Sequence, residues 1–110
     1  MKALAFMVLA ACADAPMTID EMVCPPSGTQ LTYANFGEQF FAERCERCHA
    51  SAEHGAPAAF RFDTLDDVHR HASRIFVRAA GPNTTMPPGP DDPPADERDQ
   101  LAEWLACGAP

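Results

Sequence analysis

The sequence predicts an all-α domain, and three observations support this class. Apolar residues recur at steps of three and four in the segment 64–80, as one stripe of a helix requires. No segment alternates apolar and polar residues, so no half-buried strand is indicated. Residues typical of helix starts and stops flank the apolar segments. The chain has 110 residues, enough for one domain, and we expect three main helices joined by long loops.

The first helix is expected to begin at Asn35 and to continue to residue 49. Asn35 and Glu38, three residues apart, have the pattern of a capping box with asparagine in the cap position. The side chains that share neighbouring faces of this helix are Phe36, Phe40, Phe41, Cys45 and Cys48. Residues 50–63 contain glycine and proline and are expected to form a loop.

The second helix is expected to begin at Thr64, with Asp67 as its capping acid, and to stop before Gly81. The segment 81–94 carries six prolines, which excludes a helix or a central strand there. A third helix is expected over residues 95–106, with acidic residues near its positive N-terminal end. Its apolar face consists of Leu101, Trp104 and Leu105.

The charge and the size of the chain limit its function. Eight basic residues against sixteen acidic ones give a net charge of −8, which excludes a nucleic-acid binder that neutralises phosphates. No apolar run reaches the length of about eighteen residues that a membrane span needs. A core this small is marginally stable, so we expect a disulfide, a metal or a cofactor to stabilise it.

The N-terminus is expected to be an export signal. One positive charge at Lys2 precedes an apolar run over residues 3–11, which fits the hydrophobic part of a secretory signal. The run ends in Leu-Ala-Ala-Cys, which resembles a bacterial lipobox, so residues 1–11 are a predicted signal peptide and Cys12 a predicted lipid anchor. The alternative is an ordinary signal peptide cleaved after Ala15. With Cys12 as the lipid anchor, residues 12–34 are expected to form a lipidated leader and tether, and residues 35–110 the folded domain.

A Cys-x-x-Cys-His motif carries the chemistry. Cys45 and Cys48 lie on one helical turn, where two thiols can reach both vinyl groups of one haem, and His49 is then placed as a ligand of the iron. A zinc site would need two further ligands with a paired spacing, which the other cysteines and histidines lack. A thioredoxin-like motif would need a βαβ pattern, which is absent.

Met86 is the candidate for the second axial ligand of the iron. It lies in Thr-Thr-Met-Pro-Pro, 37 residues after His49, and a rigid proline loop suits a thioether held against iron better than it suits core filling. The alternatives are His54, His69 and His71. His54 is too close to His49 in the chain to reach the opposite face of the haem easily. His69 and His71 are expected at the surface or near the haem propionates.

The segment 35–105 resembles the class I cytochrome c family. In that family a glycine and an aromatic residue precede the first haem cysteine by eight and four positions, and Gly37 and Phe41 stand there. The last helix of the family presents a leucine, an aromatic residue and an aliphatic residue, as Leu101, Trp104 and Leu105 do. The resemblance implies a fold of three main helices and long loops wrapped around one covalently bound haem c, with the first and last helices crossing closely.

The resemblance has further implications. The family places a proline after the haem motif, whose carbonyl accepts the other N–H of the axial histidine, and Pro57 is the candidate. Cys24 and Cys107 lie just outside the two crossing helices and are expected to form a disulfide in an oxidising compartment. The alternative is two unpaired buried thiols. The lysine ring with which mitochondrial relatives bind their partners is missing, so those partners are not carried over.

These features predict a one-electron carrier, not an enzyme, at the outer face of a bacterial membrane or in the periplasm. His49 and Met86 would bind the iron in both the ferric and the ferrous state. Without Lys2, seven arginines against sixteen acids leave a net charge of −9, so a redox partner with a basic docking patch is expected, and no small-molecule substrate. The alternatives are a haem-bearing subunit of a larger oxidoreductase, and a sensor or peroxidase in which Met86 leaves the iron.

Overall fold

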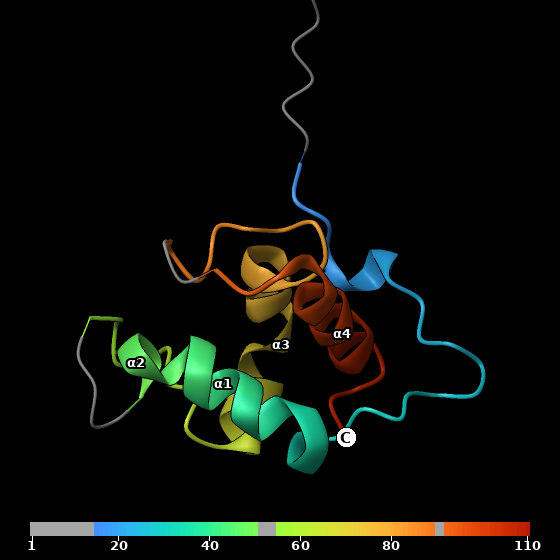
Figure 1. The fold of residues 1–110 in the computed structure, drawn as a ribbon, viewed down its shortest axis with the longest axis horizontal. Helices are drawn as coiled ribbons and strands as arrows, with labels where there is room; N and C mark the ends of the chain where they lie inside the picture. Colours follow the sequence, from blue (N-terminus) through green and yellow to red (C-terminus); the bar gives the residue numbers. More distant parts are fainter. Residues whose placement is uncertain (1–14, 51–54, 90–91) are drawn as a thin grey trace, which may run out of the picture.

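The computed structural model describes residues 15–50, 55–89 and 92–110. Within these ranges the secondary structure is entirely helical, with no strand, so the predicted all-α class is confirmed (Figure 1). The elements are a 3-10 turn η1 (Ile19–Glu21), a π-helical turn η2 (Tyr33–Gly37) and the helices α1 (Glu38–Arg44), α2 (Glu46–His49), α3 (Leu65–Ala79) and α4 (Ala95–Ala106).

The first helical segment starts earlier than the sequence predicted. The extended residue before it is Thr32, whose hydroxyl accepts a hydrogen bond from the Asn35 backbone N–H at 3.1 Å. The Asn35 side-chain oxygen in turn accepts from the Thr32 N–H at 2.7 Å. The capping box therefore pairs Thr32 with Asn35, and the prediction that Asn35 caps the helix was wrong. The segment is also interrupted at Cys45, whose φ of −122° separates α1 from α2.

The other two helices agree closely with the prediction. The Thr64 hydroxyl accepts from the Asp67 N–H, and the Asp67 carboxylate accepts from the Thr64 N–H, both at 3.2 Å, so the capping box before α3 is confirmed. Gly81 follows α3 with a φ of +57°, a left-handed conformation that glycine adopts readily. The bounds of α4 are the predicted ones, 95–106.

The core forms where the η2–α1 segment crosses α4. Trp104, Phe41 and Leu101 are completely buried, and the ring centroids of Phe41 and Trp104 are 6.3 Å apart. A Cβ atom added to Gly37 would lie 2.6 Å from Cη2 of Trp104, so only glycine allows the indole to pack this close to the backbone. Leu105 is buried beside them. The predicted close crossing is therefore confirmed.

The segment before η2 packs on the domain, so the expected tether was wrong for residues 17–34. The Met17 N–H donates to the Asn83 side-chain oxygen at 3.0 Å, and the Asn83 amide donates back to the Met17 carbonyl at 2.8 Å. The side chains that cover the core from this segment are Met17, Ile19, Met22 and Leu31. Burial of these apolar groups outweighs the freedom of an open chain.

A disulfide joins this segment to the C-terminus. Cys24 is bonded to Cys107, with 4.9 Å between the Cα atoms and 83 residues between the two positions. The predicted pairing is confirmed. The Tyr33 N–H also donates to the carbonyl of Pro110 at 2.7 Å, which places the chain end beside η2.

Cys12 and the predicted signal peptide lie outside the described residues. None of the described helices is both long and apolar enough to span a membrane.

Candidate functional site

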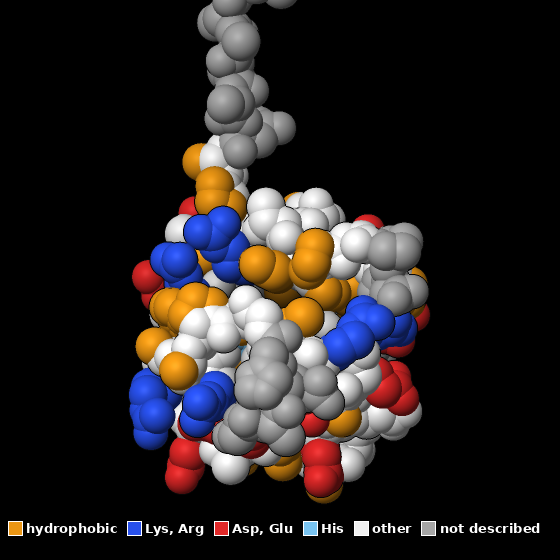
Figure 2. Space-filling model, turned by 90° about the vertical axis from the view of Figure 1, so that its left-hand side faces the viewer, with side chains coloured by type: hydrophobic (Ala, Val, Ile, Leu, Met, Phe, Trp, Pro, Cys, Tyr) orange, Lys and Arg blue, Asp and Glu red, His pale blue; other side chains and the backbone are white. Residues whose placement is uncertain are grey.

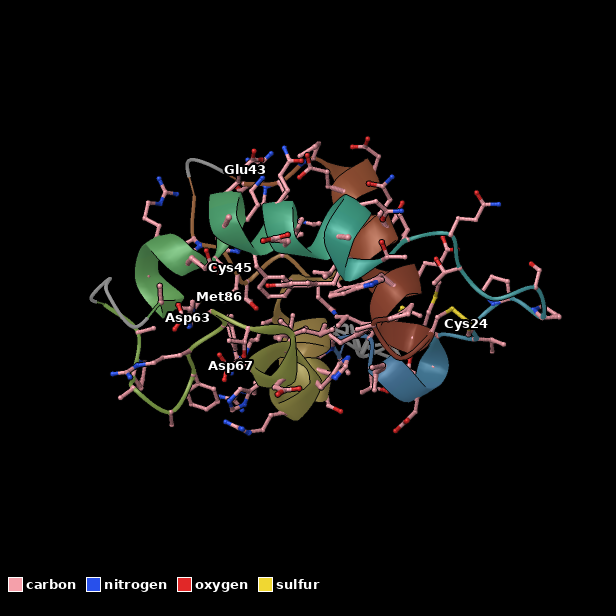
Figure 3. The ribbon with its side chains drawn as sticks, turned by 90° about the horizontal axis from the view of Figure 1, so that it is seen from below. Cys24, Glu43, Cys45, Asp63, Asp67 and Met86 are labelled. Atoms are coloured by element: carbon pink, nitrogen blue, oxygen red, sulfur yellow. A yellow bond between two sulfur atoms is a disulfide. The ribbon has the colours of Figure 1, made fainter. Side chains whose placement is uncertain are left out.

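A cavity of about 500 Å³ opens at the end of the molecule where α2, α3 and the loop after α3 meet. Cys45, Cys48 and His49 line it together with Met86, and Figure 3 shows Cys45 and Met86 close together at this end. Apolar walls come from Phe60, Phe62, Ile75, Ala79, Pro87 and Pro88. The volume is within the range of about 300–1,000 Å³ that small-molecule and cofactor sites occupy. The four residues that the sequence analysis assigned to haem binding therefore share one cavity.

The two motif cysteines lie on a single helical turn. The backbone N–H groups of Cys48 and His49 both donate to the carbonyl of Cys45, at 3.1 and 2.9 Å. Both thiols are free, Cys45 half-buried and Cys48 exposed. Burial raises the pKa of the Cys45 thiol to about 12, since the thiolate loses hydration there. The thiol is therefore neutral near pH 7, unlike the low-pKa nucleophile of a disulfide oxidoreductase.

His49 is oriented by a backbone carbonyl. Its Nδ1 lies 2.6 Å from the carbonyl oxygen of Phe60, which can only accept, so Nδ1 carries the proton and Nε2 is free to bind a metal. The imidazole also stacks on the ring of Phe62, with centroids 4.6 Å apart. The Phe62 N–H donates to the His49 carbonyl at 2.7 Å, so a second hydrogen bond joins His49 to the segment 60–62.

The assignment of this carbonyl to Pro57 was wrong. The Pro57 carbonyl accepts from the Phe60 N–H at 2.9 Å, so it is already used within its own turn. Pro57 begins a tight turn that ends at Phe60 and brings the Phe60 carbonyl to His49. Pro57 still lines the cavity. The sequence contained no signal that distinguished the proline from the residue three positions later.

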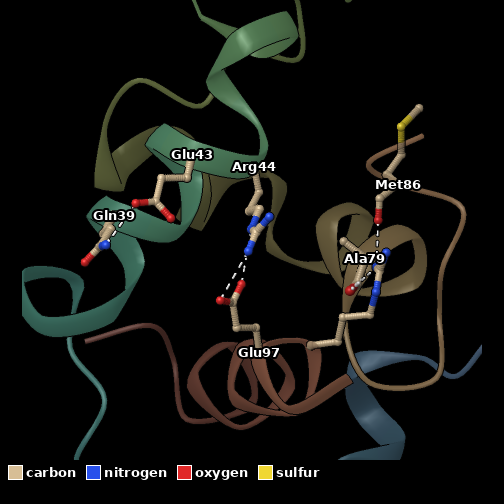
Figure 4. Close-up of polar contacts among 7 residues, drawn as sticks. Gln39, Glu43, Arg44, Ala79, Met86 and Glu97 are labelled. Atoms are coloured by element: carbon tan, nitrogen blue, oxygen red, sulfur yellow. Dashed lines mark hydrogen bonds and ion pairs between the residues drawn. The ribbon is translucent and has the colours of Figure 1, made fainter. Parts of the chain in front are cut away.

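Met86 is held through its backbone. Its N–H donates to the carbonyl of Arg78 at 2.8 Å. Its carbonyl accepts from Nη1 of Arg98 at 2.8 Å (Figure 4). The same Nη1 donates to the carbonyls of Ala79 and Asn83, at 2.9 and 3.0 Å. Arg98 is buried, and its importance was missed by the sequence analysis, because an arginine among the acidic residues of α4 is typical of a solvated face.

The alternative histidine ligands do not reach the cavity where the structure describes them. Nε2 of His69 lies 2.8 Å from the carbonyl of Ala109, at the C-terminus. His71 packs against the rings of Phe60 and Phe62 without lining the cavity. His54 lies outside the described residues. Among the described residues no group of three histidine, cysteine or acidic side chains is arranged to hold a metal ion.

The residues of the cavity fit a haem c. Two thiols on one turn match two thioether bonds, and an imidazole with a fixed tautomer and a thioether are the axial ligands of a cytochrome c. The apolar walls match the faces of a porphyrin. The cavity thus has the donors and the surroundings that such a cofactor requires, all contributed by this chain.

Comparison with known families agrees with this geometry. The sequence profile of the family described as cytochrome C oxidase, cbb3-type, subunit III matches residues 34–105. This range includes Cys45, Cys48, His49 and Met86. No curated protein and no solved structure matches the chain. The matched segment covers most of the chain and contains both the haem motif and the helix crossing. The chain therefore belongs to this family, and its domain is a class I-like c-type cytochrome domain, the haem-bearing type that carries electrons.

Proposed function

We propose that the protein is a monohaem electron carrier, with haem c attached to Cys45 and Cys48 and its iron bound by His49 and Met86. The observation that carries the proposal is that these four side chains line one cavity, although Met86 is distant from the motif in the sequence. When bound, the haem supplies the one-electron Fe(III)/Fe(II) couple.

The contacts of the two proposed ligands support a carrier. Nδ1 of His49 is engaged by the Phe60 carbonyl, and the backbone of Met86 is engaged by Arg78 and Arg98. Ligands held in this way change position little between two oxidation states, which favours fast electron exchange. A soft thioether favours ferrous iron and a positive potential.

The test is the Met86→Ala variant of the mature protein. We expect loss of the low-spin spectrum, a lower potential and binding of carbon monoxide to the ferrous form, because one axial position opens. Met17→Ala is the matched control, since that methionine packs on the core away from the cavity. An unchanged spectrum of the Met86→Ala protein would reject the ligand assignment.

The second candidate function is that of a haem-bearing subunit in an oxidase complex, since the matched family is described as an oxidase subunit. The two candidates share the haem site and differ in assembly. Haem staining of a native gel of solubilised membranes from the source cells separates them. A free carrier migrates as a single small protein, whereas a subunit migrates with a much larger complex.

We also propose that the protein is exported and held on the periplasmic side by a lipid on Cys12. The Cys24–Cys107 disulfide supports export, because such bonds persist in oxidising compartments. The Cys12→Ser protein should appear in the soluble periplasmic fraction instead of the membrane fraction. Retention of this variant on the membrane would remove the lipid assignment.

A further inference from the structure

We propose that a row of packed aromatic rings carries oxidising equivalents from the cavity to Tyr33 when the haem-loaded protein meets hydrogen peroxide. We call this row the aromatic chain, and it consists, in order, of Phe62, Phe41, Trp104 and Tyr33. The inference rests on the proposed electron carrier, because it requires a haem bound at His49. It adds a second role, the protection of the iron ligands from oxidation.

Consecutive rings of the aromatic chain are in contact. The His49 imidazole stacks on Phe62 with centroids 4.6 Å apart, and the centroids of Phe62 and Phe41 are 5.8 Å apart. The Phe41 and Trp104 centroids are 6.3 Å apart, and Trp104 stacks on Tyr33 at 6.5 Å. All four distances lie within about 4.5–7 Å, the range in which aromatic pairs interact. An unbroken row of π-systems therefore leads from a proposed iron ligand to Tyr33.

The last two rings of the aromatic chain are the ones that lose an electron readily. The sequence contains one tryptophan, Trp104, and one tyrosine, Tyr33. An indole or a phenol is oxidised much more easily than a phenyl ring, so Phe62 and Phe41 act as the bridge between the cavity and Trp104. Phe41 and Trp104 are completely buried, so bulk water does not separate these rings.

The surroundings of the two oxidisable rings favour the loss of an electron. The indole N–H of Trp104 donates to the Pro110 carbonyl at 3.2 Å, and this carbonyl dipole stabilises positive charge on the indole. Burial raises the pKa of the Tyr33 phenol, and four carboxylates raise it further. These carboxylates belong to Glu38, Glu46, Asp63 and Asp67. Their negative charge also stabilises the positive charge that an electron leaves behind on the ring.

The two ends of the aromatic chain lie at opposite ends of α1. The helix α2, which ends at His49, follows α1, whereas the turn η2, which begins at Tyr33, precedes it (Figure 1). The cavity is at the α2 end, on the face that Figure 2 shows, where hydrophobic side chains reach the surface. Tyr33 is half-buried, so a reductant in solution can reach it, whereas Trp104 is completely buried.

The electrons and protons balance with hydrogen peroxide as the oxidant and the reduced carrier as the donor. Peroxide takes up two electrons and two protons, its O–O bond breaks, and two water molecules form. The ferrous iron of the carrier supplies one electron and becomes ferric. Tyr33 supplies the other electron and its phenolic proton, and becomes a neutral phenoxyl radical, while solvent supplies the second proton. Trp104 loses an electron towards the cavity and regains one from Tyr33, so it is not consumed.

An oxidising equivalent that stays in the cavity damages the site. Met86, the second proposed iron ligand, lines the cavity, and oxidation converts its thioether to a sulfoxide. Removal of the equivalent through the aromatic chain prevents this reaction. Loss of Trp104 or of Tyr33 should therefore increase the oxidation of Met86.

Electron paramagnetic resonance of the reduced, haem-loaded protein, frozen after addition of hydrogen peroxide, provides the test. With one tyrosine and one tryptophan in the sequence, a tyrosyl signal identifies Tyr33 and a tryptophanyl signal identifies Trp104. We expect a tyrosyl signal in the wild type, its loss in Trp104→Phe, and a tryptophanyl signal in Tyr33→Phe. A tyrosyl signal of unchanged strength in Trp104→Phe would overturn the proposal.

Mass spectrometry of the same samples measures the protection. We expect the ratio of Met86 sulfoxide to Met17 sulfoxide to rise in both variants, because Met17 packs away from the cavity and reports direct attack by peroxide. Phe36→Leu is the control, since its ring packs 5.9 Å from that of Trp104 and the change removes no oxidisable ring. An equal rise in Phe36→Leu would assign the effect to loosened packing and overturn the proposal.

The remaining outcomes are also decisive. If Trp104→Phe does not fold, Tyr33→Phe keeps the ring at a half-buried position, and an unchanged sulfoxide ratio in that variant would overturn the proposal. A colourless protein would reject the electron carrier and the aromatic chain together. A coloured protein with the expected haem spectrum but no tyrosyl signal after peroxide would reject only the aromatic chain.

Discussion

The guanidinium of Arg98 donates a hydrogen bond of 2.8 Å to the carbonyl of Met86. Arg98 belongs to α4 and is only 3% exposed, and its Nη1 also bonds the carbonyls of Ala79 and Asn83. One buried side chain thus connects α4, the end of α3 and the loop that carries the proposed sulfur ligand. Through this hydrogen bond, the packing of α4 in the core determines where the backbone of Met86 lies.

Replacing Arg98 should weaken both the fold and the loop. The Arg98→Met variant keeps an apolar stem but leaves the three carbonyls without their donor, so we expect the free energy of unfolding to fall by about 1–3 kcal/mol. Denaturant unfolding measures the loss, and faster imidazole binding to the ferric protein reports the loosened Met86 loop. Arg70→Met, an exposed change on α3, should stay within about 0.5 kcal/mol. Unchanged stability and imidazole binding in the Arg98 variant would contradict this role.

The helix crossing predicts a steric effect at Gly37. In Gly37→Ala the new methyl group would lie 2.6 Å from Trp104, so the indole must shift, and we expect a loss of about 1–3 kcal/mol in unfolding free energy. Gly89→Ala is the control, because the nearest atom to its new Cβ would be an oxygen of the Asp92 carboxylate at 3.5 Å, an ordinary van der Waals distance. Thermal unfolding of the two variants compares them, and equal melting temperatures would argue against the tight crossing.

Glu46 predicts a pH dependence of stability. Burial, Asp63 and Glu38 raise the pKa of its carboxyl above the ordinary 4.5, so the ionised form is disfavoured in the folded state. This penalty is present above the raised pKa and disappears as the pH falls through it towards 4.5. Glu46→Gln should therefore be more stable than the wild type at pH 7, with a difference that shrinks towards pH 4.5.

Thermal unfolding of the haem-loaded protein across this pH range provides the measurement for Glu46. Glu43→Gln makes the same change of charge at an exposed residue of α1 and is the control. A difference for Glu46→Gln that stays constant with pH, or that grows in acid, would contradict the assigned direction.

Local patterns in the sequence predicted the parts of the fold that depend on local interactions. The capping box at Thr64 and the bounds of α4 follow from side-chain to backbone bonds within one turn. The same rule failed at Asn35, because Thr32 forms the competing box with it and only the extended backbone of Thr32 reveals which residue is the cap. Where two residues that can cap a helix lie three positions apart, the sequence alone does not show which of them is the N-cap.

The missed features of the site are contacts between backbone groups and distant side chains. The carbonyl of Phe60 reaches His49 because of the turn after Pro57, and carbonyls have no sequence signature. Arg98 meets Met86 only once α4 has packed against α3. The backbone N–H of Met17 likewise donates a hydrogen bond to Asn83, 66 positions later in the chain. The motif and Met86 were predictable because haem chemistry restricts the residue types themselves.

The central claim is that one haem is bonded to Cys45 and Cys48. The most direct measurement is a pyridine haemochrome spectrum combined with mass spectrometry of peptides from protein produced in a host that matures c-type cytochromes. We expect the spectrum of a haem with two thioether bonds and a single motif peptide that carries one haem mass. A colourless product whose motif peptide holds free thiols, or a bond between the two sulfurs, would contradict it.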